Sequence, residues 1–311
     1  MSASEKEAHT TLPSAAEWVW HQGGFCRLRE AVVPITTHSL HYGSAVFEGI
    51  RFYETKKGPA VFRLDDHLAR FEMSARTMGM RLEYTMEGYA EVIAALIRKN
   101  ELLSGYIRTI AYFGEGISLT RDDLETCVSI FLLPWPVHQS KEVIRLGISE
   151  FEKPSPASTV HAAKIAGHYV NSYLAALSVP RPRFSGALLM DWQGRVAETP
   201  VANIFGVRNG KLFTPGVNSI LPGITRDTVL QLAPPLHLEA YERSVSLQEL
   251  QYADEVFITG TAAEIAPVGA IDDVQIGEGT RGPITTVLTR AFDDCVRGIN
   301  EPPAPGWLTY V

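Results

Sequence analysis

The sequence of 311 residues is long enough for one large domain or for two of ordinary size. Hydrophobic residues make up 45% of the chain and charged residues 20%, which is typical of a soluble globular protein with a full core. A net charge of −7 without a long basic run argues against nucleic acid and anionic membranes as partners. A few local arginines and helix N-termini would still suffice to bind an anionic cofactor.

Three widely spaced cysteines, Cys26, Cys127 and Cys295, form neither a disulfide framework nor a metal-binding spacing. Residues 1–14 contain no apolar segment of the kind found in secretory signals, and we expect them to form a flexible tail. No apolar run approaches the length of a membrane span. These features predict a cytoplasmic protein.

The first half of the chain is predicted to be α+β. Gly23-Gly24 marks the turn of a hairpin, Lys57-Gly58 marks a second turn, and Asp65 is a suitable N-cap for a helix. In chain order we expect a hairpin over 18–29, a loop running into a strand over 38–55, a strand over 60–63, a helix from 65, a helix over 87–99, and strands over 106–110 and 128–133.

Pro134-Trp135-Pro136 interrupts this pattern and marks the expected domain boundary. The prediction is a small N-terminal α+β domain over 15–134, an interdomain linker over 135–140, and a larger C-terminal domain over 141–311. Asn209-Gly210 is the strongest hairpin signal in the second part. The expected elements there are strands over 144–148, 186–190, 203–208, 211–214 and 255–259, and helices over 167–178, 221–232 and 283–297.

The segment from His161 to Ser172 contains a single lysine, Lys164, which is surrounded by small residues and followed five positions later by Tyr169. Small neighbours leave room beside the amine, and burial would lower its pKa and free its lone pair for Schiff-base chemistry. The alternative is an ordinary surface lysine at a helix start, since lysine is rarely buried. The segment alone does not decide between the two.

Four other positions have the chemistry to bind an anionic cofactor or to polarise one. Thr225 is a candidate N-cap after Pro222-Gly223, where free amides and the helix dipole favour a phosphate. Gly260-Thr261 ends a predicted strand with amides and a hydroxyl, and Arg63 carries a permanent charge. Glu198, in an apolar segment, is either a solvated hairpin residue or a carboxylate directed at a ring nitrogen.

Three further patterns do not support a site. Residues 277–282 match G-x-G-x-x-G but lack a strong preceding strand and a βαβ unit, so they predict a turn. His38 and His41 have no third ligand nearby, and their stretch is not predicted to be helical, so we expect no metal site there. The sequence contains neither a G-x-S-x-G elbow nor a P-loop.

Seven segments, taken together, resemble branched-chain amino-acid aminotransferases, which are class IV pyridoxal-phosphate enzymes. The resemblance runs from about Trp18 to Leu308 and implies a two-domain fold of α+β and α/β character, PLP fold type IV (D-amino-acid aminotransferase-like). Its parts would be a small N-terminal α+β domain and a larger C-terminal pseudo-barrel domain. It also implies pyridoxal 5′-phosphate as cofactor, no metal, and a homodimer or a larger assembly of dimers. The segments are HSLHYGSAVFEGIR, HLARFEMSARTM, YIR, AAKIAGHYVNS, NIFGVRNGKLFTP, LPGITRD and ELQYADEVFITGTAAEIAPV.

The resemblance implies roles for individual residues. Lys164 would be the catalytic Schiff-base lysine and the acid/base that moves the substrate's α-proton. Glu198 would keep the ring nitrogen protonated and so make the ring an electron sink. Tyr169 would hydrogen-bond the cofactor's phenolic oxygen. The remaining cofactor-binding residues would be Arg63, Ile224, Thr225 and Thr261 at the phosphate, together with Leu221.

The same resemblance implies a substrate site. Tyr106, Arg108 and the amides of Thr261-Ala262 would orient the substrate carboxylate. Phe47, Tyr42 and Trp135 would form the walls of the side-chain pocket, with Tyr42 reaching into the neighbouring subunit's site.

The chain departs from the family pattern in four places. His168 stands where asparagine is usual, and Thr109 stands where proline is usual. The segment around Glu198 reads ETPVANIF, and the helix after Lys164 continues into LSVPRPRF. These departures spare the lysine, the ring-nitrogen acid and the phosphate site, so they bear on substrate choice more than on cofactor chemistry.

The expected activity is transamination of L-leucine, L-isoleucine or L-valine with 2-oxoglutarate as amino acceptor, as in branched-chain amino acid biosynthesis. Alternatives within the same fold are a D-amino-acid, (R)-amine or specialised-pathway transaminase and an aminodeoxychorismate-type lyase, which would release pyruvate. The Tyr106-Arg108 pair and the GTAAE segment favour the L-series. A non-enzymatic binding module would have no use for Lys164 and Glu198.

Overall fold

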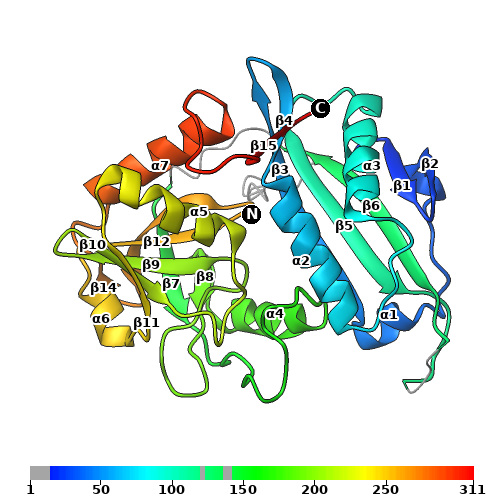
Figure 1. The fold of residues 1–311 in the computed structure, drawn as a ribbon. Coiled ribbons are helices and arrows are strands. Elements are labelled where there is room, and N and C mark those ends of the chain that lie inside the picture. The colour runs from blue at the N-terminus through cyan, green and yellow to red at the C-terminus, as the bar shows by residue number, and fades with distance from the viewer. Residues whose placement is uncertain (1–14, 120–122, 136–141) are drawn as a thin grey trace, which may run out of the picture.

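The computed structural model describes residues 15–119, 123–135 and 142–311, and the expected tail and all of the expected linker except Trp135 lie outside these ranges. Two β-sheets form the centres of two lobes, which lie side by side in Figure 1. The seven-stranded sheet consists of β1 to β6 together with β15 from the chain end, and the eight-stranded sheet contains the strands from β7 to β14.

The first sheet has the strand order β15-β4-β3-β5-β6-β1-β2, and all its neighbouring strands are antiparallel. Its longest strand, β3, alternates between two environments, as a pleated strand must. Ile50 and Phe52 point into the core of their own lobe, whereas Tyr53 belongs to an apolar cluster of the second lobe. The strands are β1 (Trp18–His21), β2 (Gly24–Arg27), β3 (Ala45–Thr55), β4 (Gly58–Phe62), β5 (Gly105–Phe113), β6 (Thr126–Pro134) and β15 (Leu308–Tyr310).

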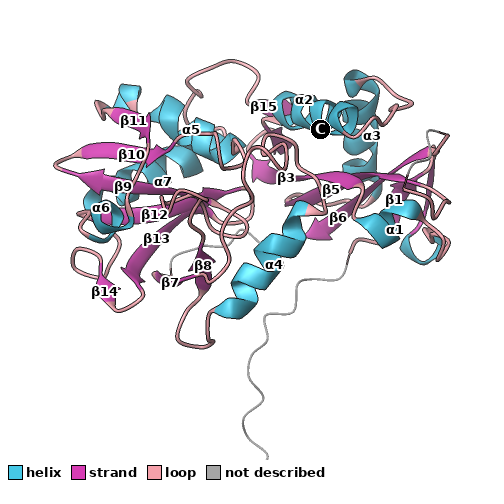
Figure 2. Ribbon diagram, turned by 90° about the horizontal axis from the view of Figure 1, so that it is seen from below, coloured by secondary structure: helices cyan, strands magenta, loops and turns pink. Residues whose placement is uncertain are grey.

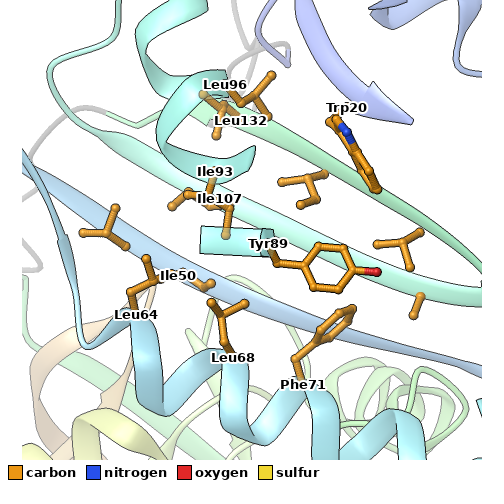
Figure 3. Packing of buried hydrophobic residues seen from close by; sticks show 14 of the residues in the cluster. Trp20, Ile50, Leu64, Leu68, Phe71, Tyr89, Ile93, Leu96, Ile107 and Leu132 are labelled. Carbon is orange, nitrogen blue, oxygen red and sulfur yellow. The ribbon is translucent and has the colours of Figure 1, made fainter. Parts of the chain in front are cut away.

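Two 14-residue helices, α2 (Leu64–Thr77) and α3 (Met86–Lys99), cover one face of this sheet. Their buried side chains recur at helical spacing and pack on the strands, as Figure 3 shows. Burial of this apolar surface contributes roughly 25 cal/mol per Å² to the stability of the lobe. The labelled core residues are Trp20, Ile50, Leu64, Leu68, Phe71, Tyr89, Ile93, Leu96, Ile107 and Leu132.

The second sheet has the order β11-β10-β9-β12-β13-β7-β8, with β14 paired to β13. Three of its pairs are parallel, namely β10–β11, β13–β7 and β7–β8. Its strands are β7 (Ile144–Ile148), β8 (Gly186–Leu188), β9 (Asn203–Arg208), β10 (Lys211–Pro215), β11 (Ala240–Arg243), β12 (Glu255–Gly260), β13 (Glu264–Ile271) and β14 (Val274–Gln275).

Helices α5 (Ile224–Leu232) and α7 (Pro283–Val296) pack on the second sheet through one apolar cluster. Helix α4 (His168–Ser178) projects from the region between the lobes, as Figure 2 shows. The remaining helical elements are short: η1 (Leu28–Glu30), α1 (His38–Tyr42), η2 (Pro234–Leu236) and α6 (Leu247–Gln251).

Several expected elements are confirmed within a few residues. Strand β7 has the expected bounds, α3 begins one residue earlier than expected, and the β9–β10 hairpin turns at Asn209-Gly210. These two turn residues have φ angles of 50° and 78°, which a two-residue hairpin turn requires. Residues 277–282 form a turn with positive φ at Gly277 and Gly279, so the G-x-G-x-x-G pattern here is a turn signal.

Three expectations about where helices start are wrong, and they concern α1, α2 and α5. The stretch from His38 is the helix α1 and not a loop. Helix α2 begins at Leu64 with Arg63 in the N-cap position at φ 52°, and Asp65 lies within the helix. Arg63 occupies this conformation because β4 runs directly into α2, where the Arg63 amide donates to the Trp307 carbonyl at 2.7 Å.

Helix α5 begins at Ile224 with Gly223 as N-cap, so Thr225 lies in its first turn and is not the cap. A β-carbon at Gly223 would come within 2.0 Å of Asn203 Oδ1, which explains why a residue without a side chain caps this helix. The backbone amides of the first turn remain without intrahelical partners in either case.

The chain end returns to the first lobe, which sequence reasoning did not predict. Strand β15 pairs with β4, and residues 142–271 lie between these two strands in the sequence. We therefore propose the division into domains over 15–134 and 141–311 with one qualification. The last strand, β15, comes from the second domain in sequence but joins the sheet of the first domain. Within the described ranges, the helices all fall short of the length and apolar character needed to cross a membrane.

Candidate active site

A cavity lined by residues of both lobes brings together ionisable side chains from the two of them. Arg70 enters from α2 of the first lobe, and Glu198 and Thr225 enter from the second lobe. Lys164 and Tyr169 come from the segment that leads into α4. Seven predicted site residues thus share one cavity with Arg70: Lys164, Tyr169, Glu198, Leu221, Ile224, Thr225 and Thr261.

Backbone hydrogen bonds attach the lysine segment to β3 of the first lobe. The Phe47 amide donates to the Lys164 carbonyl at 3.1 Å, and the Ala166 amide donates to the Ala45 carbonyl at 2.7 Å. The Lys164 amide donates to Ser74 Oγ of α2 at 2.9 Å. Lys164 is therefore fixed by the first lobe while its side chain faces the cavity.

The Lys164 amine lies in an environment that disfavours its charge. Burial, followed by the nearby Arg70 guanidinium, lowers the pKa of Lys164 to about 8. Its Nζ donates to Tyr169 Oη at 2.6 Å and lies 5.0 Å from the centre of the Phe47 ring. Burial and the Glu198 charge raise the pKa of Tyr169 to about 12, so the hydroxyl stays neutral beside the amine. About a tenth of Lys164 is therefore a neutral amine at pH 7, far more than for an ordinary lysine.

Glu198 is a buried carboxylate, 6% exposed, that also lines the cavity. One oxygen lies 2.8 Å from Lys153 Nζ and 3.5 Å from the Leu221 amide, and the other accepts from Asn203 Nδ2 at 3.0 Å. Burial raises the pKa of Glu198, and the Lys153 ammonium opposes that rise. The sequence alternative of a solvated hairpin residue is therefore wrong.

A group of backbone amides and hydroxyls lines the cavity where α5 begins. The α5 N-terminus supplies free amides and the positive end of its dipole. Gly260 and Thr261, at the end of β12, also line the cavity. Thr259 Oγ1 is buried without a hydrogen-bond partner, which leaves one further donor for a bound group. Such a set of donors suits a phosphate.

Arg63 does not line this cavity. Its guanidinium is 2.7 Å from Asp66 and 2.5 Å from Asp227, and it also donates to Thr228 Oγ1 at 3.2 Å. Arg70, two helical turns further along α2, lines the cavity instead and donates to the Pro222 carbonyl next to the start of α5 at 2.9 Å. The geometry therefore favours Arg70 as the arginine for a phosphate.

Arg70 is held in place by a buried acid. Its Nε and Nη2 donate to the two oxygens of Glu48 at 2.6 and 2.9 Å, and His67 Nδ1 lies 2.8 Å from the same carboxylate. Burial alone would raise the pKa of Glu48, but Arg70 and His67 hold it well below its usual range. One hydrogen on each of Nη1 and Nη2 remains available to a ligand in this arrangement.

The predicted substrate residues form a second group beside Lys164. The Phe47 ring lies 4.8 Å from the Tyr169 ring and 4.5 Å from the Arg108 guanidinium. Arg108 donates to Tyr106 Oη at 3.3 Å, and the Tyr106 ring lies 5.7 Å from Trp135. Gly49 makes this possible, because a β-carbon there would lie 1.7 Å from Tyr106 Oη.

Of the predicted substrate residues, Thr261 lines the cavity, whereas Tyr42, Phe47, Tyr106, Arg108, Trp135 and Ala262 are not part of its lining. Tyr42 lies on α1, 43% exposed, and donates to the Ile117 carbonyl at 2.6 Å. Ala262 follows Thr261 in the turn between β12 and β13. Of the two single-residue departures from the family pattern, His168 lines the cavity, and Thr109 is buried with a hydroxyl that lacks a partner.

Sequence reasoning missed several residues that this site brings together. Arg70 lies seven positions after Arg63, so a helical period would have offered it as an equal candidate. Lys153 carried no signal, because the loop between β7 and α4 has no periodic pattern. The residues missed are Glu48, His67, Arg70, Lys153, Asn203 and Thr259.

The donor set fits a phosphorylated pyridine aldehyde. It contains an amine of lowered pKa, a buried carboxylate, a neutral hydroxyl, and an arginine beside a helix N-terminus. In the described part of the chain, no cluster of three or more histidine, cysteine, aspartate or glutamate residues could hold a metal ion. Known proteins provide an independent comparison.

The family model of amino-transferase class IV matches residues 45–271. The chain is 38% identical over 298 residues to the branched-chain-amino-acid aminotransferase of Pseudomonas aeruginosa, which covers 94% of this chain and 97% of that protein. It is 37% identical over 303 residues to the corresponding Escherichia coli enzyme, which covers 95% of this chain and 98% of that protein.

Solved structures give the same result for the fold. The branched-chain amino acid aminotransferase of T.th., solved with pyridoxamine 5′-phosphate, superposes with a TM-score of 0.92 at 37% identity, covering 95% of this chain and 98% of that one. The same enzyme complexed with N-(5′-phosphopyridoxyl)-L-glutamate has a TM-score of 0.92, again at 37% identity and the same coverage. The Escherichia coli enzyme has a TM-score of 0.90 at 37% identity, covering 94% and 98%.

Proposed function

The chain belongs to the amino-transferase class IV family, and on that premise we propose that it transfers amino groups between L-leucine, L-isoleucine or L-valine and 2-oxoglutarate. The expected fold of this class is confirmed by the solved relatives, and enzymes of this class use pyridoxal 5′-phosphate. One observation carries the proposal most directly. The Lys164 amine, with a pKa lowered to about 8, shares a cavity with the buried Glu198 carboxylate.

Pyridoxal 5′-phosphate supplies an aldehyde that condenses with amines and a ring that accepts the electron pair left on a substrate α-carbon. The chain's own residues would bind it at three places. Arg70, the first turn of α5 with Thr225, and Thr261 would hold the phosphate. Glu198 would accept the ring N–H, and Tyr169 would hydrogen-bond the phenolic oxygen. Arg63 would stabilise the start of α2 through Asp66 and Asp227.

Lys164 would serve as nucleophile and proton carrier. A lysine whose pKa is about 8 offers its lone pair to an aldehyde and can later take up the substrate's α-proton. Tyr169 Oη, 2.6 Å from Nζ, limits the directions that the amine can take. The proton would move between Lys164 and the α-carbon within the cavity.

Tyr106, Arg108 and the Thr261-Ala262 amides would orient the carboxylates of amino acid and oxo acid. The Phe47 ring between Arg108 and Tyr169 would contact the aliphatic side chain of leucine, isoleucine or valine, with Trp135 beside Tyr106. Holding the α-carbon in a fixed orientation toward Lys164 lowers the activation free energy by about 7–11 kcal/mol at most.

The active unit would be a homodimer or a larger assembly of dimers. The support is the set of large apolar side chains that are exposed on α1 and α4. Tyr42 on α1 would reach the partner's cavity. We also place the enzyme in the cytoplasm, in keeping with three free cysteines. The exposed apolar residues are Leu40, Tyr42, Val170, Tyr173, Leu174 and Leu177.

A spectroscopic half-reaction tests the proposed function. Purified protein is loaded with pyridoxal 5′-phosphate and challenged separately with L-amino acids, D-amino acids and primary amines. We expect L-leucine, L-isoleucine and L-valine to bleach the visible absorbance of the lysine-bound cofactor, and 2-oxoglutarate to restore it. Bleaching by D-amino acids or (R)-amines alone would replace the proposal with the corresponding transaminase. Pyruvate release without an amino acceptor would indicate a lyase.

A further inference from the structure

Lys153 is a largely buried cation that has no role in the function proposed above. It lies in the loop between β7 and α4, with its side chain only 10% exposed, and it lines the cavity. Burying a charged amine is costly unless a partner compensates it. Its one described ionic partner is Glu198, with Nζ 2.8 Å from Oε1.

The backbone around Lys153 is fixed from three sides. The Lys153 amide donates to the Met190 carbonyl at 2.8 Å. Next to it, the Pro154 carbonyl lies 2.8 Å from His161 Nε2, and the Glu152 carbonyl accepts from Asn171 Nδ2 of α4 at 3.0 Å. The ammonium is thus positioned by the fold rather than by chance contact of a flexible side chain.

The two oxygens of Glu198 face different partners. Oε1 faces Lys153 and the Leu221 amide, whereas Oε2 accepts only from the neutral amide of Asn203. The other ionisable groups that line this cavity are Lys164, Tyr169, Arg70, His161 and His168. Burial and the Lys153 charge lower the pKa of both histidines, that of His168 to about 4, so they are neutral where Lys153 is charged. Lys153 is therefore the one cation in direct contact with Glu198 among the described residues.

We propose that Lys153 is a positioning residue that keeps Glu198 ionised, so that a proton shared between Glu198 and a bound pyridine nitrogen resides on the nitrogen. This inference rests on the proposed function. A buried carboxyl without a counter-ion takes up a proton and becomes neutral. A neutral carboxyl can donate to the nitrogen but leaves the ring uncharged. The Lys153 ammonium stabilises the carboxylate, and the same proton then charges the ring.

Three variants separate charge from packing. Lys153→Met removes the charge at similar volume, Lys153→Gln removes the charge but keeps a hydrogen-bond donor, and Lys153→Arg keeps the charge. Lys211→Met is the matched control, because Lys211 is also paired with a glutamate at 2.9 Å but lies on the surface. If Lys153→Met fails to fold, Lys153→Gln gives the same test with a polar group beside Glu198.

The first measurement uses the apoenzyme and needs no activity. Infrared difference spectra against Glu198→Gln report whether Glu198 is a carboxylate or a protonated carboxyl. We expect the carboxylate in the native chain, in Lys153→Arg and in Lys211→Met at neutral pH. In Lys153→Met and Lys153→Gln, the midpoint of Glu198 protonation should rise by about one pH unit or more. A midpoint that does not move in either neutral variant would overturn the proposal.

The second measurement compares the dissociation constants of pyridoxal 5′-phosphate and an analogue with carbon in place of the ring nitrogen. The native chain and Lys153→Arg should prefer the nitrogen compound. Loss of the Lys153 charge should reduce this preference about tenfold, the effect of one pKa unit. An unchanged preference in both neutral variants would contradict the proposal. Failure of every variant and of the native chain to bind pyridoxal 5′-phosphate would instead refute the proposed function, while the apoenzyme spectra still decide the state of Glu198.

Discussion

Lys164, which is partly exposed, and Glu198, which is buried, are ionisable groups that line one cavity, yet the charged groups around them act on their pKa values differently. The nearest polar partner of the Lys164 amine is the neutral Tyr169 hydroxyl, and the Arg70 charge disfavours protonation of the amine. Glu198 instead has an ammonium group 2.8 Å away. Burial drives both groups toward their neutral forms.

Burial favours the neutral form of both groups, and the presence or absence of a counter-ion then determines how strongly each charged form is disfavoured. Within the described ranges, no carboxylate lies at ion-pair distance from Lys164, so the amine gives up its charge easily. Glu198 has Lys153, whose ammonium opposes the rise in pKa that burial causes. The same fold thus lowers the pKa of the amine and places a cation beside the acid in one cavity, an arrangement that suits acid–base chemistry on a bound ring.

Removing the amine should have the largest effect. Lys164→Ala should lower turnover by about 10⁴-fold or more, because one group supplies both the nucleophile and the proton carrier. The variant should still bind pyridoxal 5′-phosphate through the phosphate contacts, without the covalent bond. Borohydride reduction followed by peptide mapping measures that bond directly. Turnover near the native rate, or labelling at another lysine, would remove Lys164 from this role.

Removing the opposite charge should have the next largest effect. Glu198→Gln should lower turnover by about 10²- to 10³-fold, which is typical for the loss of one buried electrostatic contact to a reacting group. Its amide cannot carry the negative charge that holds a proton on the ring. The matched control is Glu239→Gln, which breaks an exposed pair with Lys211. Equal losses in the two variants would contradict a specific role for Glu198.

The two arginines of α2 offer a paired test of the phosphate site. Arg70→Lys should weaken binding of pyridoxal 5′-phosphate about tenfold, because a lysine keeps the charge but loses the forked hydrogen bonds. Arg63→Lys should leave that affinity within about twofold and should mainly lower the melting temperature, because Arg63 contacts Asp66 and Asp227. Fluorescence titration of the apoenzymes measures the affinities. The reverse pattern would restore Arg63 to the phosphate.

Much of the periodic structure could be predicted from the sequence, and the reasons are local. Strand β7 and helix α3 follow their apolar spacing, and Asn209-Gly210 specifies a hairpin by its backbone angles. The small neighbours of Lys164 make it a candidate, but that segment alone also allows an ordinary surface lysine. The contacts between lobes carry no such local signal. The Lys153–Glu198 pair joins two loops 45 residues apart, and β15 pairs with a strand of the opposite lobe.

Arg63 and Arg70 show why the site could be predicted only in part. Both are arginines on one helix, two turns apart, and sequence alone gives no reason to prefer either. The choice is made by Glu48 and Pro222, which lie on other elements and receive three hydrogen bonds from Arg70. The residue type thus indicates which chemistry is available, but contacts with residues distant in sequence determine which of the two arginines can serve the phosphate site.

The pH dependence of the amine tests the comparison most finely. The reaction of the apoenzyme with an aldehyde should become about tenfold faster per unit pH below pH 8, because only the neutral form of Lys164 reacts, and it should level off above that value. An ordinary lysine would continue to gain reactivity up to about pH 10.5.

The same lowered pKa affects stability. Between pH 8 and pH 10.5 the unfolded chain binds more protons at Lys164 than the folded chain does, so this group makes the free energy of unfolding rise with pH in that range. Stopped-flow absorbance with pyridoxal, with Lys164→Ala as blank, gives the midpoint. A midpoint near 10.5 would show that the cavity does not lower the pKa of Lys164, and the difference between the environments of Lys164 and Glu198 would not hold.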